Sequence, residues 1–286
     1  MKKLILKLGA TAGLICLATT GAMAETGQAV SDETIAKQRA MLAAATDGAG
    51  YGPQSPRDID SIDGTNTRLF NSAPPVTAMT LCDIHFHENA EHKGGSFTTY
   101  AGNGDGHGFG TGFKYSGTLS DAELAPIDTK VGASEHGDLV PGDTIEIHFV
   151  YSTAKASLGN GLGTCFTDQV SNPQLRVEAV VGVLVSDPNA VSMTEMAEIK
   201  TMSGLNQNPN LPDNLGTPVT YAGSTTGPGY NEKGSPFQVT WSVRPEVVKI
   251  NIASVGEWLA DNPFGEDHAH GVRNLVVNPS LLSSMN

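Results

Sequence analysis

The chain has 286 residues, of which 39% are hydrophobic, and this is enough apolar material for the core of one large β-rich domain or two small ones. Its 30 acidic and 17 basic residues give a net charge of −13. An acidic balance of this size argues against nucleic acid or an anionic membrane surface as a partner.

The N-terminus has the pattern of a secretory signal. Lys2 and Lys3 precede an apolar run, and small residues ending at Ala24 form a cleavage site. The segment is too short and wrongly flanked to span a membrane. We therefore expect residues 1–24 to be removed and the protein to be periplasmic or secreted. With 14 basic residues left against 30 acidic ones, the mature chain would carry a net charge of −16.

Two cysteines remain after this cleavage, Cys82 and Cys165. In an exported protein an even number of cysteines most simply forms disulfides. We expect these two to pair if their geometry permits it.

After the signal, residues 25–50 are expected to form a peripheral N-terminal arm. Ser31 to Ala45 predicts a short helix with Ser31 as its N-cap. From residue 51 to 286, short apolar runs are separated by Gly, Pro, Asn and Asp, which is typical of a single β-dominated domain. The predicted strands are 79–87, 97–101, 143–152, 175–186, 237–243 and 247–253.

The predicted strand 79–87 carries an acid and two histidines in one row. Because side chains alternate along a strand, Asp83, His85 and His87 share one face. The opposite face receives Cys82, Ile84 and Phe86. Two imidazoles and an acid in such a row form two thirds of a metal site with a hydrogen-bond acceptor attached.

The predicted strand 143–152 supplies the missing third. Alternation places Glu146, His148 and Val150 on one face. A working zinc site has three protein ligands and an open position for water, and neutral imidazole is its commonest ligand. A ligand histidine usually donates its second N–H to a carboxylate or carbonyl, which indicates roles for Asp83 and Glu146. The predicted zinc ligands are His85, His87 and His148.

At these residues the chain resembles the α-class carbonic anhydrases. In that family an HFH strand is followed by S-E-H and then by an E-[LI]-H strand, as at His85–His87, Ser134–His136 and Glu146–His148. Other segments similar to family motifs follow in the family's order, over about residues 54 to 255. They are Gln54–Ile59, Val177–Val183, Leu211–Pro212, Thr220–Pro228 and Val239–Trp241. The HFHENAEH segment and the insertion at 89–133 resemble the δ class and its bacterial relatives more closely.

The resemblance implies a central, twisted, mostly antiparallel β-sheet with few short helices and one zinc ion per chain. It implies that Thr225 orients a zinc-bound hydroxide and that Glu135 is the buried carboxylate accepting from this threonine. The apolar wall for carbon dioxide would be formed by Val150, Val180 and Trp241.

Departures from the family pattern leave alternatives open. A missing leucine before Thr225 makes Thr226 its rival, and Glu91, in an A-E-H context, is the rival of Glu135. No histidine precedes His85, so the usual proton shuttle is absent, and His92 and His107 become the candidates. The second His-x-His, at Asp267 to His270, has turn composition and is expected to be a solvated segment.

The predicted function is that of an exported zinc carbonic anhydrase, with carbon dioxide and bicarbonate as its small-molecule partners. The alternatives are a catalytically silent carbonic anhydrase-like binding protein and a periplasmic zinc-binding protein. The latter would have a closed site with His92 or Glu91 as fourth ligand. Because silent relatives typically lack one ligand histidine, the intact set favours the enzyme. The oligomeric state, including a homodimer, is left open.

Overall fold

The structure is a computed structural model that describes residues 29–61, 64–68, 70–225, 229 and 231–285. The predicted signal and Thr226 lie outside the described residues. No helix in the described part of the chain is both long and apolar enough to cross a membrane.

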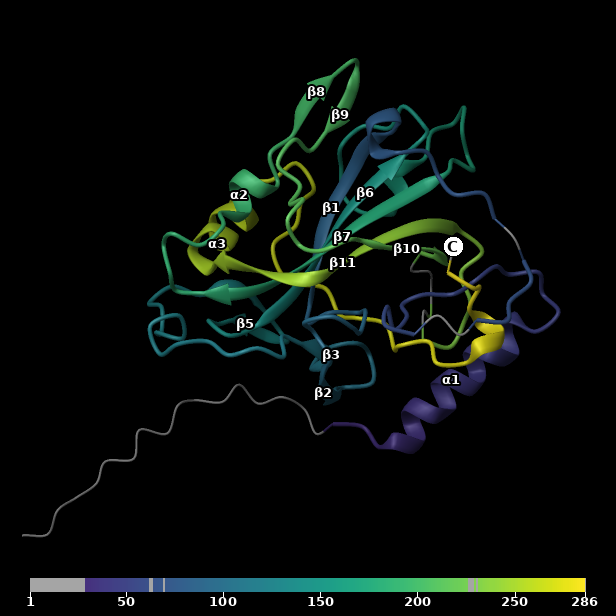
Figure 1. Ribbon diagram of the computed structural model, residues 1–286, viewed down its shortest axis with the longest axis horizontal. Coiled ribbons are helices and arrows are strands. Elements are labelled where there is room, and N and C mark those ends of the chain that lie inside the picture. Colours follow the sequence, from purple (N-terminus) through teal and green to yellow (C-terminus); the bar gives the residue numbers. More distant parts are fainter. Residues whose placement is uncertain (1–28, 62–63, 69, 226–228, 230, 286) are drawn as a thin grey trace, which may run out of the picture.

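A twisted sheet of five strands forms the centre of the molecule (Figure 1). The spatial order is β1-β6-β7-β11-β10, and only β7 and β11 are parallel neighbours. The strands are β1 (Thr80–Glu88), β6 (Thr144–Ser152), β7 (Leu175–Val185), β10 (Val219–Ser224) and β11 (Gln238–Asn251). The expected mainly β fold with a mostly antiparallel central sheet is therefore confirmed.

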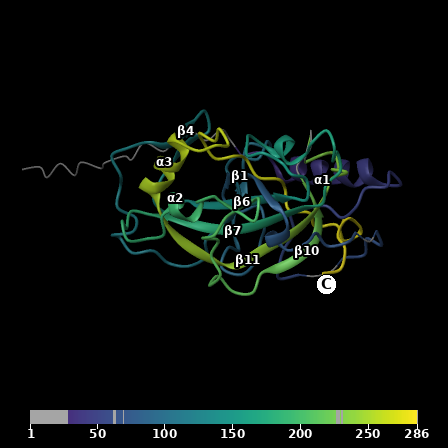
Figure 2. The same ribbon diagram turned by 90° about the horizontal axis from the view of Figure 1, so that it is seen from above.

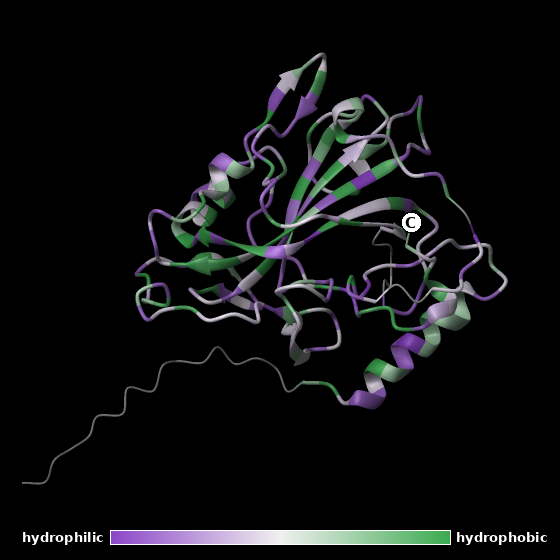
Figure 3. Ribbon diagram, in the orientation of Figure 1, coloured by the Kyte–Doolittle hydropathy of each residue, from purple (hydrophilic) through white to green (hydrophobic). Residues whose placement is uncertain are grey.

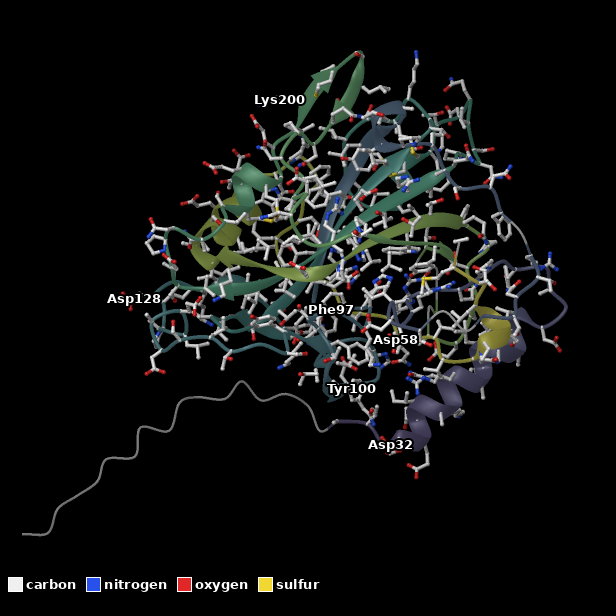
Figure 4. All side chains as sticks on the ribbon, in the orientation of Figure 1. Asp32, Asp58, Phe97, Tyr100, Asp128 and Lys200 are labelled. Atoms are coloured by element: carbon white, nitrogen blue, oxygen red, sulfur yellow. A yellow bond between two sulfur atoms is a disulfide. The ribbon has the colours of Figure 1, made fainter. Side chains whose placement is uncertain are left out.

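Shorter elements surround this sheet. The helices are α1 (Asp32–Thr46), α2 (Met193–Met196) and α3 (Ile252–Ala260), with 3-10 turns η1 (Val76–Ala78), η2 (Leu162–Cys165) and η3 (Pro279–Leu281). Small hairpins pair β2 (Thr99–Asn103) with β3 (Thr111–Lys114), β4 (Val131–Ser134) with β5 (Gly137–Leu139), and β8 (Lys200–Met202) with β9 (Leu205–Gln207). Helices α2 and α3 lie at one end of the sheet and α1 at the other (Figure 2). The β8–β9 hairpin, marked by Lys200 in Figure 4, projects from the body.

The predicted helix and strands are observed with two differences, but β10 of the central sheet, the hairpin strands β3, β4, β5, β8 and β9, and helices α2 and α3 were not predicted. Helix α1 begins just after Ser31, whose side chain accepts a hydrogen bond from the Thr34 amide, as predicted. The predicted strands 237–243 and 247–253 are a single strand, β11, whose pairing with β7 is irregular between Val243 and Val247. The strand prediction is wrong at its C-terminal end, because α3 already begins at Ile252 with Asn251 as its cap.

The central sheet separates two hydrophobic clusters. Ile84, Phe86 and Ile147 belong to the cluster on one face, whereas Val150 and Trp241 belong to the cluster on the other. Figure 3 shows apolar residues concentrated along the central strands, while polar and apolar residues alternate along α1. The ligand histidines share the face of Val150 and Trp241, because His148 and Val150 are two residues apart on β6.

A β-bulge interrupts β1 at Cys82. Leu81 pairs with Tyr151 and Asp83 pairs with Val150, so Cys82 is an extra residue in the ladder. Cys82 consequently packs in the cluster of Val150, and the prediction that it shares a face with Ile84 and Phe86 is wrong. The predicted disulfide between Cys82 and Cys165 is confirmed, with an S–S distance of 2.01 Å.

Candidate metal centre

Three imidazole rings meet on one face of the central sheet. His85 on β1 lies directly opposite His148 on β6, and His87 follows in the same row. The His148 ring centroid lies 5.1 Å from that of His85 and 4.6 Å from that of His87. One potential ligand atom from each of the three histidines lies within 4.8 Å of the others. The pairing register of two strands therefore brings together the predicted ligands.

Each ring is oriented by a hydrogen bond through one nitrogen. His85 Nδ1 lies 2.7 Å from Asp83 Oδ2, and His148 Nε2 lies 2.8 Å from Glu146 Oε1. His87 Nδ1 donates to the carbonyl oxygen of Gly271 at 2.9 Å. The nitrogens left over are Nε2 of His85, Nε2 of His87 and Nδ1 of His148. These three atoms could together bind a metal ion, and Asp83 and Glu146 contact the histidine rings as predicted.

The electrostatics of the rings favour this use. Burial lowers the pKa of His87 well below the ordinary value for histidine, and burial also lowers the pKa of His148. Both rings are therefore neutral at pH 7, which a metal ligand must be. Burial also lowers the pKa of His85, but the hydrogen bond and charge of Asp83 outweigh it and raise that pKa overall. At His85 a metal ion competes with a proton.

Glu146 joins the third ligand to a buried hydrogen-bond network. Its carboxylate lies 2.6 Å from His92 Nδ1, and the other nitrogen of His92 lies 2.6 Å from Tyr221 Oη. Tyr221 in turn donates to Ser55 Oγ at 3.3 Å. His92 has no exposed surface. The prediction of His92 as a proton shuttle is therefore wrong, because a shuttle must exchange protons with solvent.

Of the two rival carboxylates, only Glu91 is buried. The side chain of Glu135 is 88% exposed in the turn between β4 and β5, so the prediction that it is the buried acid is wrong. Glu91 is 1% exposed, and Arg273 Nε lies 3.2 Å from its Oε1. Burial alone would raise the pKa of Glu91, but the positive charge of Arg273 lowers it, so this carboxyl is ionised.

The predicted apolar wall is partly on the site face. Trp241 lies against the ligands, with ring centroids 4.9 Å from His148, and Val150 belongs to the same cluster. Val180 packs on the opposite face of the sheet, so its assignment to the wall is wrong. Ala179 pairs with His148 across β6 and β7 and takes that place. The motif could not decide between these neighbours, because one residue of register reverses the face.

Thr225 directly follows β10 and is 7% exposed. Its hydroxyl is 3.2 Å from Ser235 Oγ, and its carbonyl accepts from Arg273 Nη1 at 3.0 Å. Trp241 Nε1 donates to the preceding carbonyl, that of Ser224. The predicted shuttle candidate His107 is exposed on the loop between β2 and β3.

Sequence reasoning missed the contribution of residues 270–273. The amide of His270 donates to the carbonyl of Phe86, and its carbonyl accepts from Glu88, so this segment adds to the edge of β1. The His270 ring centroid lies 5.5 Å from that of His85, and its side chain is 47% exposed. The His270 side chain is solvent-exposed as expected, but the pairing of its backbone with β1 was not predicted. The His-x-His motif was the only sequence signal for this segment, and the turn-like composition around it argued against a role in the site.

Comparison with known proteins gives one family match. The family model described as delta carbonic anhydrase matches residues 76–254. No curated protein sequence matches the chain significantly. Among solved structures, the alpha-carbonic anhydrase of Photobacterium profundum is similar at 18% identity over 86% of this chain and 95% of that chain, with a TM-score of 0.27.

Two further solved structures are similar to a comparable extent. A hyperthermostable carbonic anhydrase from a hydrothermal vent chimney is 17% identical over 80% of this chain and 86% of that one, with a TM-score of 0.28. A halotolerant carbonic anhydrase from Dunaliella salina is 16% identical over 78% and 85%, with a TM-score of 0.29.

Proposed function

The chain belongs to the delta carbonic anhydrase family, and from this premise we propose that it is an exported zinc enzyme that reversibly hydrates carbon dioxide to bicarbonate and a proton. The observation that carries this proposal is the convergence of three imidazoles whose other nitrogens are already engaged. An open three-histidine site is the arrangement of catalytic rather than structural zinc.

The donor set fits a zinc ion. His85, His87 and His148 would hold it, with Asp83, Glu146 and the Gly271 carbonyl fixing the ring orientations. A zinc ion in such a site lowers the pKa of a bound water to about 7 and thereby supplies a nucleophile at neutral pH. One ion per chain follows from the one three-histidine set that the described residues contain.

The protein's own residues would bind and orient the substrate. Carbon dioxide carries no net charge and no hydrogen to donate, so an apolar wall beside the ligands suits it. Val150, Ala179 and Trp241 supply apolar surface on the ligand face. Glu91, ionised and buried, is the carboxylate we assign to the hydroxyl-orienting pair, with Thr225 as its partner. Thr226 stays the alternative to Thr225.

A closed four-ligand storage site is less well supported. Both ring nitrogens of His92 are engaged, with Glu146 and with Tyr221, and Glu91 is held by Arg273. Among the described residues, neither side chain has a potential ligand atom grouped with those of the three histidines. The short distances among His92, Glu146 and His148, which also qualify as a metal-binding group, are those of hydrogen bonds.

The compartment we propose is the periplasm or the exterior. A disulfide between Cys82 and Cys165 fits an oxidising compartment. Cleavage near Ala24 belongs to the same proposal. The net charge of −13 continues to argue against nucleic acid as a partner.

The test is stopped-flow hydration of carbon dioxide by purified protein of measured zinc content. We expect about one zinc per chain and a kcat/KM on the order of 10⁶ M⁻¹s⁻¹ or more. His148→Ala should lose both metal and rate, whereas His136→Ala, on the exposed β4–β5 turn, should keep both. Stoichiometric zinc without hydration above buffer would overturn the proposed activity and favour a binding protein.

A further inference from the structure

Residues beyond the family match complete the candidate site. The match ends at residue 254, whereas the segment 270–273 runs along the edge of β1 and reaches the ligand face from outside the five-stranded sheet. Within four residues it supplies the Gly271 carbonyl that orients His87 and the guanidinium of Arg273.

Arg273 holds two parts of the site with one planar group. Its backbone amide and its Nε both donate to Glu91 Oε1, at 3.0 and 3.2 Å, and its Nη2 lies 3.4 Å from Glu91 Oε2. Its Nη1 donates to the carbonyl of Thr225 at 3.0 Å and lies 3.5 Å from that of Ser224. The side chain of Arg273 is 4% exposed and that of Glu91 1%.

This geometry fixes a distance that neither partner fixes alone. Glu91 follows β1, and Thr225 directly follows β10, the strand at the opposite edge of the central sheet. A guanidinium is rigid and planar and presents its donors in a fixed fork, so it can set the separation of a carboxylate and a carbonyl. A lysine would retain the charge but could not reach both partners with the same geometry.

We propose that Arg273 is a positioning residue, which clamps the Glu91 carboxylate and the Thr225 backbone in the relative arrangement that carbon dioxide hydration requires. This inference rests on the proposed function, because it assigns Arg273 a role in that reaction. Arg273 does not touch the substrate; it acts through Glu91 and Thr225.

The chain contains a matched control for a purely structural ion pair. Arg244 Nη1 donates to Glu178 Oε2 at 3.0 Å, and the side chains of Arg244 and Glu178 are 8% and 9% exposed. Glu178 pairs with Phe149, one residue from His148, so it points to the face opposite the ligands. Arg244→Met therefore breaks a buried pair of the same chemistry without touching the site.

The experiment compares Arg273→Met, Arg273→Lys and Arg244→Met with wild type in three measurements. These are the zinc dissociation constant, kcat/KM for carbon dioxide hydration, and the exchange rate of the Thr225 amide in the metal-free protein by NMR. The Thr225 amide donates to the Phe237 carbonyl, so its exchange reports local opening at the threonine.

We expect Arg273→Met to bind zinc within about threefold of wild type, because the ligand set is intact. Its kcat/KM should fall at least about tenfold, the cost of slight misplacement in a site that depends on orientation. Arg273→Lys should recover only part of this loss. Thr225 exchange should accelerate at least about tenfold more in Arg273→Met than in Arg244→Met.

A double-mutant cycle with Glu91→Gln tests whether Arg273 acts through Glu91. If it does, Arg273→Met on the Glu91→Gln background should lose less than about threefold further in kcat/KM. The double variant also removes both buried charges, so it is the reserve should Arg273→Met fail to fold. The clamp would be overturned if the losses in kcat/KM of the two single variants multiplied in the double variant. It would also be overturned if Arg273→Met and Arg244→Met had the same kcat/KM and the same Thr225 exchange rate. Should the wild type fail to hydrate carbon dioxide, the proposed function fails, and Thr225 exchange still decides whether the clamp exists.

Discussion

Removal of the Asp83 carboxylate should weaken zinc binding without changing the ligand set. Asp83 is fully buried, and its Oδ2 lies 2.7 Å from His85 Nδ1. Asp83→Ala leaves that N–H without its acceptor, frees the ring to rotate and makes the imidazole less basic. Loss of such a supporting acceptor typically costs 10- to 100-fold in metal affinity, which is about 1.4–2.8 kcal/mol. The side chain of His85 is 22% exposed, so water can replace part of the acceptor, and we expect the lower half of this range.

The assay is competition for zinc between metal-free protein and a chelator of known affinity at pH 7.5. Asp83→Asn retains an oxygen acceptor and should lose less than about tenfold, which separates ring orientation from charge. Asp267→Ala is a surface control, because Asp267 also pairs with a histidine, His268, at 2.5 Å, but its side chain is 84% exposed and His268 is not one of the three predicted ligands. A zinc affinity of Asp83→Ala within about threefold of wild type would refute the reasoning.

Three further outcomes can be checked. Glu91→Gln should lower kcat/KM at least about tenfold. The side chain of Glu135 is 88% exposed, so Glu135→Gln should leave kcat/KM within about twofold of wild type. A larger loss in Glu135→Gln than in Glu91→Gln, in the same stopped-flow assay, would restore Glu135 as the site acid. Folding lowers the pKa of Glu91 from its ordinary value of 4.5. The ionised carboxylate therefore contributes its full stabilisation above about pH 4.5, and this stabilisation is lost as the pH falls below that value. The urea midpoint of metal-free protein should thus fall between about pH 5 and pH 3, and less steeply in Glu91→Gln; equal slopes would contradict this. The double variant Cys82→Ala, Cys165→Ala lacks the disulfide between residues 83 apart, which the chain-entropy model values at about 4.5 kcal/mol. In urea unfolding, the free energy of unfolding of this variant should be roughly 2–5 kcal/mol lower than that of the oxidised wild type. A difference below about 1 kcal/mol would show that the bond contributes little.

The sequence sufficed for the ligands because their signal is local. Strand alternation alone places His85 and His87 in one row, and the same rule places His148 beside Glu146. The mostly antiparallel sheet and the disulfide were likewise predictable from motif order and cysteine number. The row of His85 and His87 needed no knowledge of which strands are neighbours, whereas placing His148 beside it assumed that β1 and β6 pair.

What depends on register or long-range packing was not predictable. The choice between Val180 and Ala179 needed the pairing of β6 with β7, and the face of Cys82 needed the bulge in β1. The choice between Glu91 and Glu135 needed the partner of the carboxylate, Arg273, which lies 182 residues from Glu91 in the chain. No spacing rule reports a contact of that kind, because it arises only when the chain has folded.

The bulge at Cys82 allows two neighbouring residues to serve the same side of the sheet. In a regular strand, consecutive side chains point in opposite directions, so a residue next to Asp83 would face away from the ligands. The extra residue cancels that alternation once, and Cys82 is tied covalently to η2 while Asp83 holds His85. This single bulge thus lets the disulfide-bonded Cys82 and the residue that orients His85, Asp83, be neighbours on one side of the sheet. Its removal would force the chain to give up one of the two.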